Sequence, residues 1–207
     1  MSWSHVASVN GSSSSASFSP GSWPSGVADG DIVVFCAMIA PDGGGQGISC
    51  ATTGWRQQAA YGEPARMMWA RYNAVLALPT ITLTGSTTCT WYMLAFRRTE
   101  ASAIGLILGV DGSPAPAQSY TAYGSDQLLV IFGTVPGDTG STWSHAGGFT
   151  QLVNVNGNGS GNSNAPNIFI GWQNVASPST IASIYARIST QNRFYMLSAG
   201  VCANALF

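Results

Sequence analysis

The stretch WYMLAF at residues 91–96 returns as FYMLSA at residues 194–199, and the features around it recur in the same order. An acidic residue before an apolar run occurs at 31–35 and again at 126–132. A Gly-aromatic pair occurs at 54–55 and at 148–149, and a strand ending near Asn occurs at 67–73 and at 168–174. The distance in sequence between equivalent features of the two copies ranges from 94 residues, between Gly54 and Gly148, to 103 residues, between Trp91 and Phe194. Self-similarity of this kind predicts the duplication of a β unit of roughly five strands.

The apolar segments are short and are separated by Gly and Pro, which is typical of strands. Residues 32–39 form a nearly continuous apolar run, as expected of a strand buried on both faces. Residues 87–96 alternate, with Cys89, Trp91 and Met93 on one face and Tyr92, Leu94 and Phe96 on the other. We therefore predict an all-β fold, a jelly-roll-like β-sandwich built from two tandem, diverged half-repeats.

The predicted organisation has an N-terminal arm or edge segment at 1–26 and a single β-sandwich domain at 27–207. Within that domain we expect half-repeats at 27–110 and 119–207, joined by a linker at 111–118. Residues 66–77 have a helix-like composition, but their counterpart at 167–175 is β-branched and aromatic, so both are predicted to be strands. The insert at 154–167 consists of turn formers and is expected to be a loop.

Charge is scarce in this chain. Charged residues make up 7% of it, there is no lysine, and the formal net charge is −1; a typical chain has about 25% charged residues. A nearly neutral surface does not resist association, so we expect an assembled state. Seven scattered arginines provide no electrostatic footprint for nucleic acid, which we exclude as a partner.

No apolar run approaches the length of a membrane span, and the first residues lack the features of a signal peptide. The four cysteines form no CxxC pair. We expect them to be free thiols, buried where they fall in apolar strands, at Cys36, Cys50, Cys89 and Cys202.

Groups for catalysis are few. His5 and His145 lie in the terminal segment and in a Gly-rich loop, and no nucleophile-base motif accompanies them. The two glutamates, Glu63 and Glu100, are interpreted as solvated turn or strand-end residues. The equivalent loops at 42–45 and 138–141 each offer one carboxylate, whereas Ca²⁺ requires about six oxygens or more. We expect no enzymatic activity, no metal and no cofactor.

Carbohydrate binding requires exposed aromatic side chains beside Asn or Asp on loops. Tyr61 and Trp143 are the candidate glycan contacts. Trp172 is a further aromatic candidate, but it belongs to an apolar strand, and we interpret it as a core residue.

Several motifs together resemble the two-copy β-sandwich structural proteins of tailed bacteriophages. They are GVADGDIVVF (26–35), RYNA (71–74), TITLTG (80–85) and WYMLAFR (91–97), with DQLLVIFG (126–133) and GFT (148–150) in the second copy. The resemblance covers residues 20–200. It implies a virion component of head or tail, made in the bacterial cytoplasm, with no cofactor and no reaction. Gly148-Phe149 stands where a second Gly-Trp pair is expected.

Within a virion, the sequence favours a capsid decoration protein, also called a cement or head auxiliary protein, which stabilises the shell by binding the major capsid protein and copies of itself. The symmetry of self-association is left open, a trimer being one option. The alternative is a tail or fibre module that binds the host surface or carbohydrate, with the loop at 154–167 facing the ligand.

Large apolar side chains near the chain ends are the candidate assembly contacts, because such groups are seldom left in water without a partner. The alternative is that they fold back onto their own sandwich. These residues are Trp3, Phe18, Trp23, Leu206 and Phe207.

Overall fold

The computed structural model describes seventeen strands and, in the same residues, no helix. The all-β prediction is therefore confirmed for the described part of the chain. The described residues are 2–40, 47–57, 65–85, 88–98, 105–112, 118–121, 127–135, 143–145, 148–155, 166–175, 180–184, 186–188 and 195–202. Among these residues, only the backbone is described at 40, 105–112, 118–121, 135, 180–184, 186–188 and 195–202.

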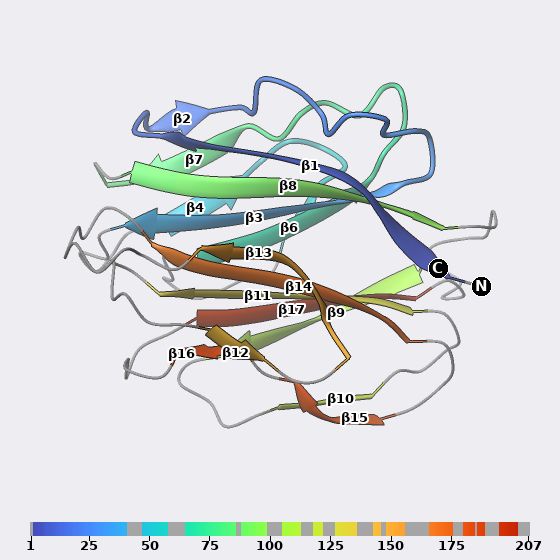
Figure 1. Cartoon of the computed structure of the whole chain (residues 1–207). Coiled ribbons are helices and arrows are strands. Elements are labelled where there is room, and N and C mark those ends of the chain that lie inside the picture. The colour runs from blue at the N-terminus through green and yellow to red at the C-terminus, as the bar shows by residue number, and fades with distance from the viewer. Residues whose placement is uncertain are drawn as a thin grey trace.

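Two five-stranded antiparallel sheets form the body of the molecule (Figure 1). The first sheet has the order β1-β8-β3-β6-β5, with bounds Trp3–Ser13, Thr88–Arg98, Ile32–Ala40, Ala65–Arg71 and Arg56–Gln57. The second sheet has the order β9-β17-β11-β14-β13, with bounds Gly105–Gly112, Tyr195–Cys202, Gln127–Val135, Asn167–Val175 and Thr150–Val155.

Three smaller sheets complete the described strands. The three-stranded sheet β2-β7-β4 has bounds Ser17–Phe18, Ile81–Thr84 and Gly47–Cys50. The pairs β10-β15 and β12-β16 have bounds Gln118–Thr121 with Thr180–Ile184, and Trp143–His145 with Ala186–Ile188.

The main core lies between the two five-stranded sheets, which makes the molecule a β-sandwich. Alternate residues of β3, such as Val34, pack in one cluster with alternate residues of β11 and β14, such as Phe132 and Ile170. Period-two alternation places these side chains on the inner face of each strand. Burying apolar surface of this kind stabilises a fold by about 25 cal/mol per Å². All three side chains have no exposed surface.

The outer face of the first sheet is also covered. The other residues of β3, including Val33 and Phe35, pack in a second cluster with Ile48 of β4 and Ile81 and Leu83 of β7. The predicted two-faced burial of 32–39 is therefore confirmed. The predicted alternation of β8 is confirmed as well, since Trp91 and Met93 belong to the outer cluster, and Leu94 and Phe96 to the inner one.

The two large sheets have the same strand order when each is read from its first strand in the sequence. In the first sheet Ile32 pairs with Arg71 and Phe96. In the second sheet Val130 pairs with Trp172 and Ala199. From β6 to β14 the residue number of the paired position rises from 71 to 172, by as much as from 73 to 174 in the sequence match. From β8 to β17 it rises from 96 to 199, by as much as from 91 to 194 in the sequence match.

The β3-to-β11 offset differs from the one in the sequence match. The ladders relate Ile32 to Val130, and so relate Asp31 to Leu129 rather than to Asp126. The apolar runs are therefore offset by three residues from the sequence alignment. The reason is local: β3 begins after a turn that Asp31 closes, whereas β11 already carries ladder pairs from Gln127.

Sheet membership divides the strands between β8 and β9. β1 to β8 supply the first sheet and its three-stranded cover, and β9 pairs with β17 of the second sheet. The predicted strand at 66–77 ends at Arg71. There the Asn73 side chain accepts a hydrogen bond from the Val75 backbone N–H, and a turn replaces the strand.

Candidate assembly edge and aromatic surface

The three predicted assembly contacts that the structure describes are buried or half-buried. Trp3 is 4% exposed and belongs to the core between the sheets, so its ring has almost no surface for a partner. Phe18 is half-buried and stacks on Trp91, with ring centroids 6.5 Å apart. Trp23 is half-buried as well. Leu206 and Phe207 lie outside the described residues.

Of the two predicted glycan contacts, the structure describes Trp143. Trp143 of β12 is 7% exposed and packs on Phe169, with centroids 6.1 Å apart. Trp172 is half-buried and packs on Phe96 at 5.7 Å, in agreement with its interpretation as a core residue. Tyr61 lies outside the described residues.

The first candidate surface is the free side of β1. This strand is eleven residues long and contains no Asp, Glu, Lys, Arg or Pro. It pairs with β8, and among the described strands it has no partner on its other side. A bulge at Val6 shifts the register near its start, after which Ala7 to Ser13 continue without interruption. Exposed edges normally carry charges, prolines, bulges or very short strands that prevent pairing with another chain.

The other three edges of the two large sheets have such protection. β5 begins with a charged residue, Arg56, and is described over two residues. β13 carries a register shift between Gln151 and Val153 in the middle of the strand. β9 carries an acidic residue, Asp111, at its seventh position. Among these edges, β1 therefore offers the longest regular and uncharged one.

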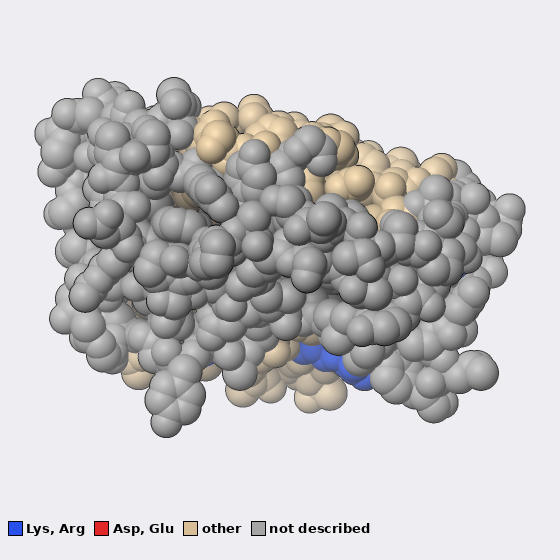
Figure 2. Space-filling model, turned by 90° about the horizontal axis from the view of Figure 1, so that it is seen from below, with Lys and Arg blue, Asp and Glu red and all other residues tan. Residues whose placement is uncertain are grey.

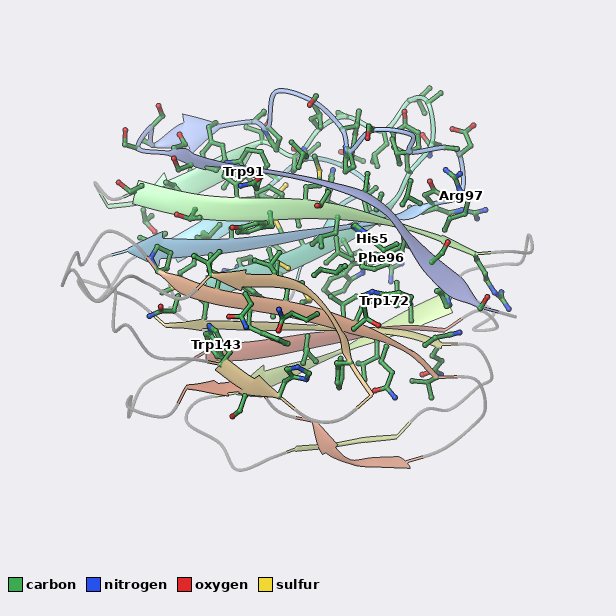
Figure 3. The ribbon with its side chains drawn as sticks, in the orientation of Figure 1. His5, Trp91, Phe96, Arg97, Trp143 and Trp172 are labelled. Carbon is green, nitrogen blue, oxygen red and sulfur yellow. The ribbon has the colours of Figure 1, made fainter. Side chains whose placement is uncertain are left out.

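β1 is held firmly on its sheet. The His5 ring contacts Phe96 edge-on at 5.6 Å (Figure 3). Burial lowers the pKa of His5, and a backbone hydrogen bond with Ala7 partly offsets this effect. Further along, a Cβ on Gly11 would lie 2.7 Å from Cζ2 of Trp91, so only glycine lets that indole lie across the strand.

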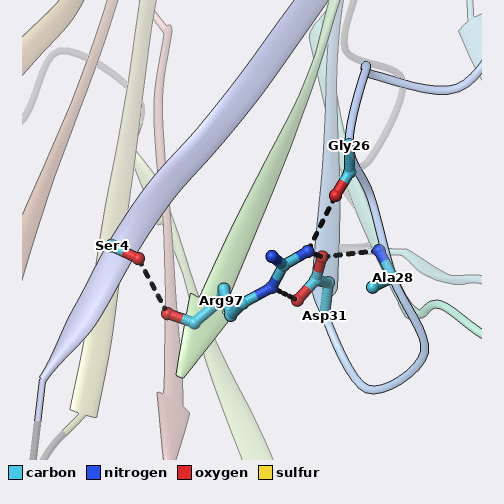
Figure 4. Close-up of polar contacts among 5 residues, drawn as sticks. All are labelled: Ser4, Gly26, Ala28, Asp31 and Arg97. Atoms are coloured by element: carbon cyan, nitrogen blue, oxygen red, sulfur yellow. Dashed lines mark hydrogen bonds and ion pairs between the residues drawn. The ribbon is translucent and has the colours of Figure 1, made fainter. Parts of the chain in front are cut away.

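An ion pair anchors the end of β8 beside β1 (Figure 4). Arg97 donates from Nε to Oδ1 of Asp31 at 2.9 Å and from Nη2 to Oδ2 at 2.7 Å. The same Nη2 donates to the Gly26 carbonyl at 2.8 Å, and the Ala28 N–H donates to Oδ2 at 2.8 Å. The hydrogen bonds from Arg97 to Asp31 raise the pKa of Arg97. The Ser4 hydroxyl donates to the Arg97 carbonyl at 3.4 Å, so this network also reaches β1.

The second candidate surface consists of Trp23, Trp55 and Tyr72, which we call the aromatic group. The indoles of Trp23 and Trp55 are parallel within 4°, with centroids 6.1 Å apart. Tyr72 meets Trp23 edge-on at 5.0 Å. All three side chains are half-buried and pack at the margin of the outer cluster.

Three separate loops build the aromatic group. Trp55 follows Gly54, whose φ of +90° closes the preceding turn, and its Nε1 donates to the Ala77 carbonyl at 3.0 Å. Tyr72 directly follows β6, and its N–H donates to the Asp31 carbonyl at 2.8 Å. In the turn beyond Tyr72, Val75 is 91% exposed.

Trp55 and Tyr72 are not among the site residues predicted from the sequence. Their signals were present, because Gly54-Trp55 and 71–74 were both recognised as motifs. In the sequence, the Gly-Trp pair marks the internal repeat and 71–74 marks a strand end. Only the fold shows that the two segments meet beside Trp23.

The cysteine thiols whose side chains are described are enclosed. Cys36, Cys50 and Cys89 are free and buried, as predicted, while the side chain of Cys202 is outside the description. Burial raises the pKa of Cys36 and raises that of Cys89 to about 12. The described residues contain no group of three or more His, Cys, Asp or Glu side chains suited to a metal ion.

In the view of Figure 2, the described atoms are mainly uncharged, apart from one group of arginine atoms near the margin. The described residues include no helix that is long and apolar enough to cross a membrane.

Comparison of the chain with protein-family models, curated proteins and solved structures found no match in any of the three.

Proposed function

We propose that this chain is a non-enzymatic structural protein of a bacteriophage virion, and that it decorates the capsid. In this role it stabilises the shell by binding the major capsid protein and further copies of itself. The observation that carries the proposal is the uncharged, regular edge of β1, which is suited to a permanent contact with another protein surface.

Composition supports the same proposal. A chain with 7% charged residues and a net charge of −1 relies on neutral polar groups for solubility. Such a surface loses little electrostatic hydration when it is covered, which suits permanent assembly. The resemblance to phage structural proteins supplies the virion as the place where this occurs.

Capsid binding tests the proposal directly. Purified protein is mixed with phage capsids that lack their decoration protein, and bound protein is counted after sedimentation. We expect saturation at a stoichiometry set by the capsid symmetry, together with greater resistance of the shells to heat. Protein that remains in the supernatant at saturating concentration would overturn the decoration role.

The duplication belongs to this proposal too. Two sheets with the same strand order and matching ladders support an origin by tandem duplication of one β unit. The jelly-roll likeness remains a prediction.

The aromatic group favours a second function, a tail or fibre module that binds carbohydrate. The apolar C–H face of a sugar ring packs well on a flat indole, and polar neighbours fix its orientation. Here the neighbours are Arg71 and Asn73, both exposed and adjacent to Tyr72.

A glycan array followed by titration tests this second function. The Trp23→Ala variant is expected to lower the affinity by about tenfold or more, since stacking with an aromatic ring contributes on the order of 1 kcal/mol or more. The control is Val75→Ser, which changes a highly exposed apolar side chain in the neighbouring turn and should leave binding unchanged. Wild-type protein that binds no glycan would exclude the module.

A further inference from the structure

We propose that β1 pairs with β1 of a second copy, antiparallel and about a twofold axis perpendicular to the sheet, to form a dimer with a continuous ten-stranded sheet. This inference rests on the proposed structural function and names the surface through which copies associate. It is argued from the free edge, from its charge and from the faces of the strand.

The segment from Ala7 to Ser13 supplies the geometry. These seven residues pair with β8 in one unbroken register, so their backbone is already a regular, ordered strand. In an antiparallel ladder, alternate residues direct their N–H and C=O groups away from the existing partner. A second strand satisfies those groups with main-chain hydrogen bonds, and the ordered edge loses little entropy on pairing.

The two faces of β1 match those of a second copy. Ala7, Val9 and Gly11 pair with β8 residues of the outer face, such as Met93, while Ser8, Asn10 and Ser12 pair with the opposite set. Rotation about an axis perpendicular to the sheet leaves each face on its own side. The less polar residues of one strand therefore meet those of the other, and the exposed Ser and Asn side chains meet each other.

Charge favours a second copy as the occupant. Like charges placed opposite each other destabilise a strand pair, and a symmetric interface always places a charge near its own copy. β1 has no formally charged residue at neutral pH, and burial keeps the pKa of His5 low. The nearest alternative is β9 of another copy. That pairing is heterologous and leaves further edges open, so it would produce rings or filaments instead of a closed dimer.

The first measurement is the mass of the full chain by analytical ultracentrifugation over about a hundredfold range of concentration. We expect a reversible equilibrium between monomer and dimer. A strict monomer over the whole range, or growth into larger rings and filaments, would overturn the proposal.

The decisive variant is Ser8→Lys with Asn10→Lys. Both side chains are exposed, so the fold should be retained, as checked by circular dichroism and a thermal melt. Four lysines facing one another across the twofold axis are expected to raise the dimer dissociation constant by about tenfold or more. The matched control, Thr82→Lys with Thr84→Lys, places the same charges on exposed positions of β7, which has partners on both sides, and should leave dimerisation unchanged.

A charge-swap experiment tests whether the two β1 strands lie next to each other in the dimer. Ser8→Glu with Asn10→Glu should also dimerise more weakly than wild type when alone, and mixing it with the lysine variant should restore a dimer containing one copy of each. A lysine variant that dimerises like wild type, or mixed variants that stay apart, would refute pairing through β1. Capsid binding is measured separately, so protein that decorates capsids as a monomer would refute this inference while leaving the proposed function standing.

Discussion

Asp31 and Arg97 are 66 positions apart in the sequence and form a two-pronged ion pair in which both carboxylate oxygens accept a hydrogen bond from the guanidinium. The carboxylate is 3% exposed, whereas the arginine side chain is 44% exposed. The pair joins the start of β3 to the end of β8 and fixes the loop at 26–31. Its role is structural, and it can be measured.

Removing the arginine should destabilise the protein. Arg97→Ala leaves the buried carboxylate with the Ala28 N–H as its remaining partner among the contacts described, and we expect a loss of about 2 kcal/mol in the free energy of unfolding. This is below the loss for a fully buried pair, because water reaches Arg97.

Denaturant unfolding measures the effect of this change. Arg97→Lys keeps the charge without the two-pronged geometry and should recover part of the loss. Arg71→Ala, at another exposed arginine, should change stability by less than about 0.5 kcal/mol. Equal effects of Arg97→Ala and Arg71→Ala would show that the ion pair contributes nothing.

Gly11 should not tolerate a side chain. The Cβ of Gly11→Ala would lie 2.7 Å from Trp91, which is buried and held between Phe35 and Phe18. We expect a loss of about 1–3 kcal/mol, measured by thermal unfolding and by a shift in tryptophan fluorescence. Gly21→Ala is the control, because nothing lies within 4 Å of its added Cβ. If the two variants melt together, the close approach of Trp91 is unimportant.

Acid should weaken the fold through His5. Its pKa in the folded state is below the unfolded value of about 6.5, so the unfolded chain binds more protons as the pH falls. Stability is therefore fully present above pH of about 6.5 and decreases below it, until the pH passes the lower, folded pKa.

Unfolding curves collected between neutral and mildly acidic pH measure this dependence. His5→Gln does not titrate, so it should flatten this part of the stability curve. An identical pH dependence in wild type and His5→Gln would contradict the assignment.

The thiols of Cys36 and Cys89 should resist modification in the folded protein, because only the thiolate reacts and burial raises both pKa values. Brief treatment with iodoacetamide followed by peptide mass mapping should find neither residue labelled. The same treatment in denaturant should label both. Rapid labelling of Cys36 under native conditions would show that the core between the sheets opens readily.

Some of this architecture could be predicted from sequence because it depends on local patterns. The alternation of β8 and the two-faced apolar run of β3 follow from side-chain direction in a strand. β1 is different. Its WSHVASVNGSS sequence has weak strand propensity, and it is ordered by contacts with distant residues, such as His5 with Phe96.

The candidate surfaces could not be predicted from local sequence patterns, because the fold brings their residues together. The aromatic group joins Trp23, Trp55 and Tyr72 from three loops, and no spacing in the sequence brings them together. The sequence indicates the terminal aromatics as contacts only through their size and their position near the chain end. Trp3 then proved to be a core residue, because β1 reaches far enough along β8 to place its ring between the sheets.

The core shared by the two sheets has a consequence during synthesis. Strands β1 to β8 leave the ribosome first, and their inner apolar face, including Val34 and Phe96, has no cover until β11 and β14 emerge. At about 5–20 residues per second this interval lasts on the order of ten seconds. A nascent chain released early would present that face to other nascent chains or to chaperones. The same dependence suggests a split version cut between Arg98 and Gly105, whose two fragments should recover the native fold only when they are produced together.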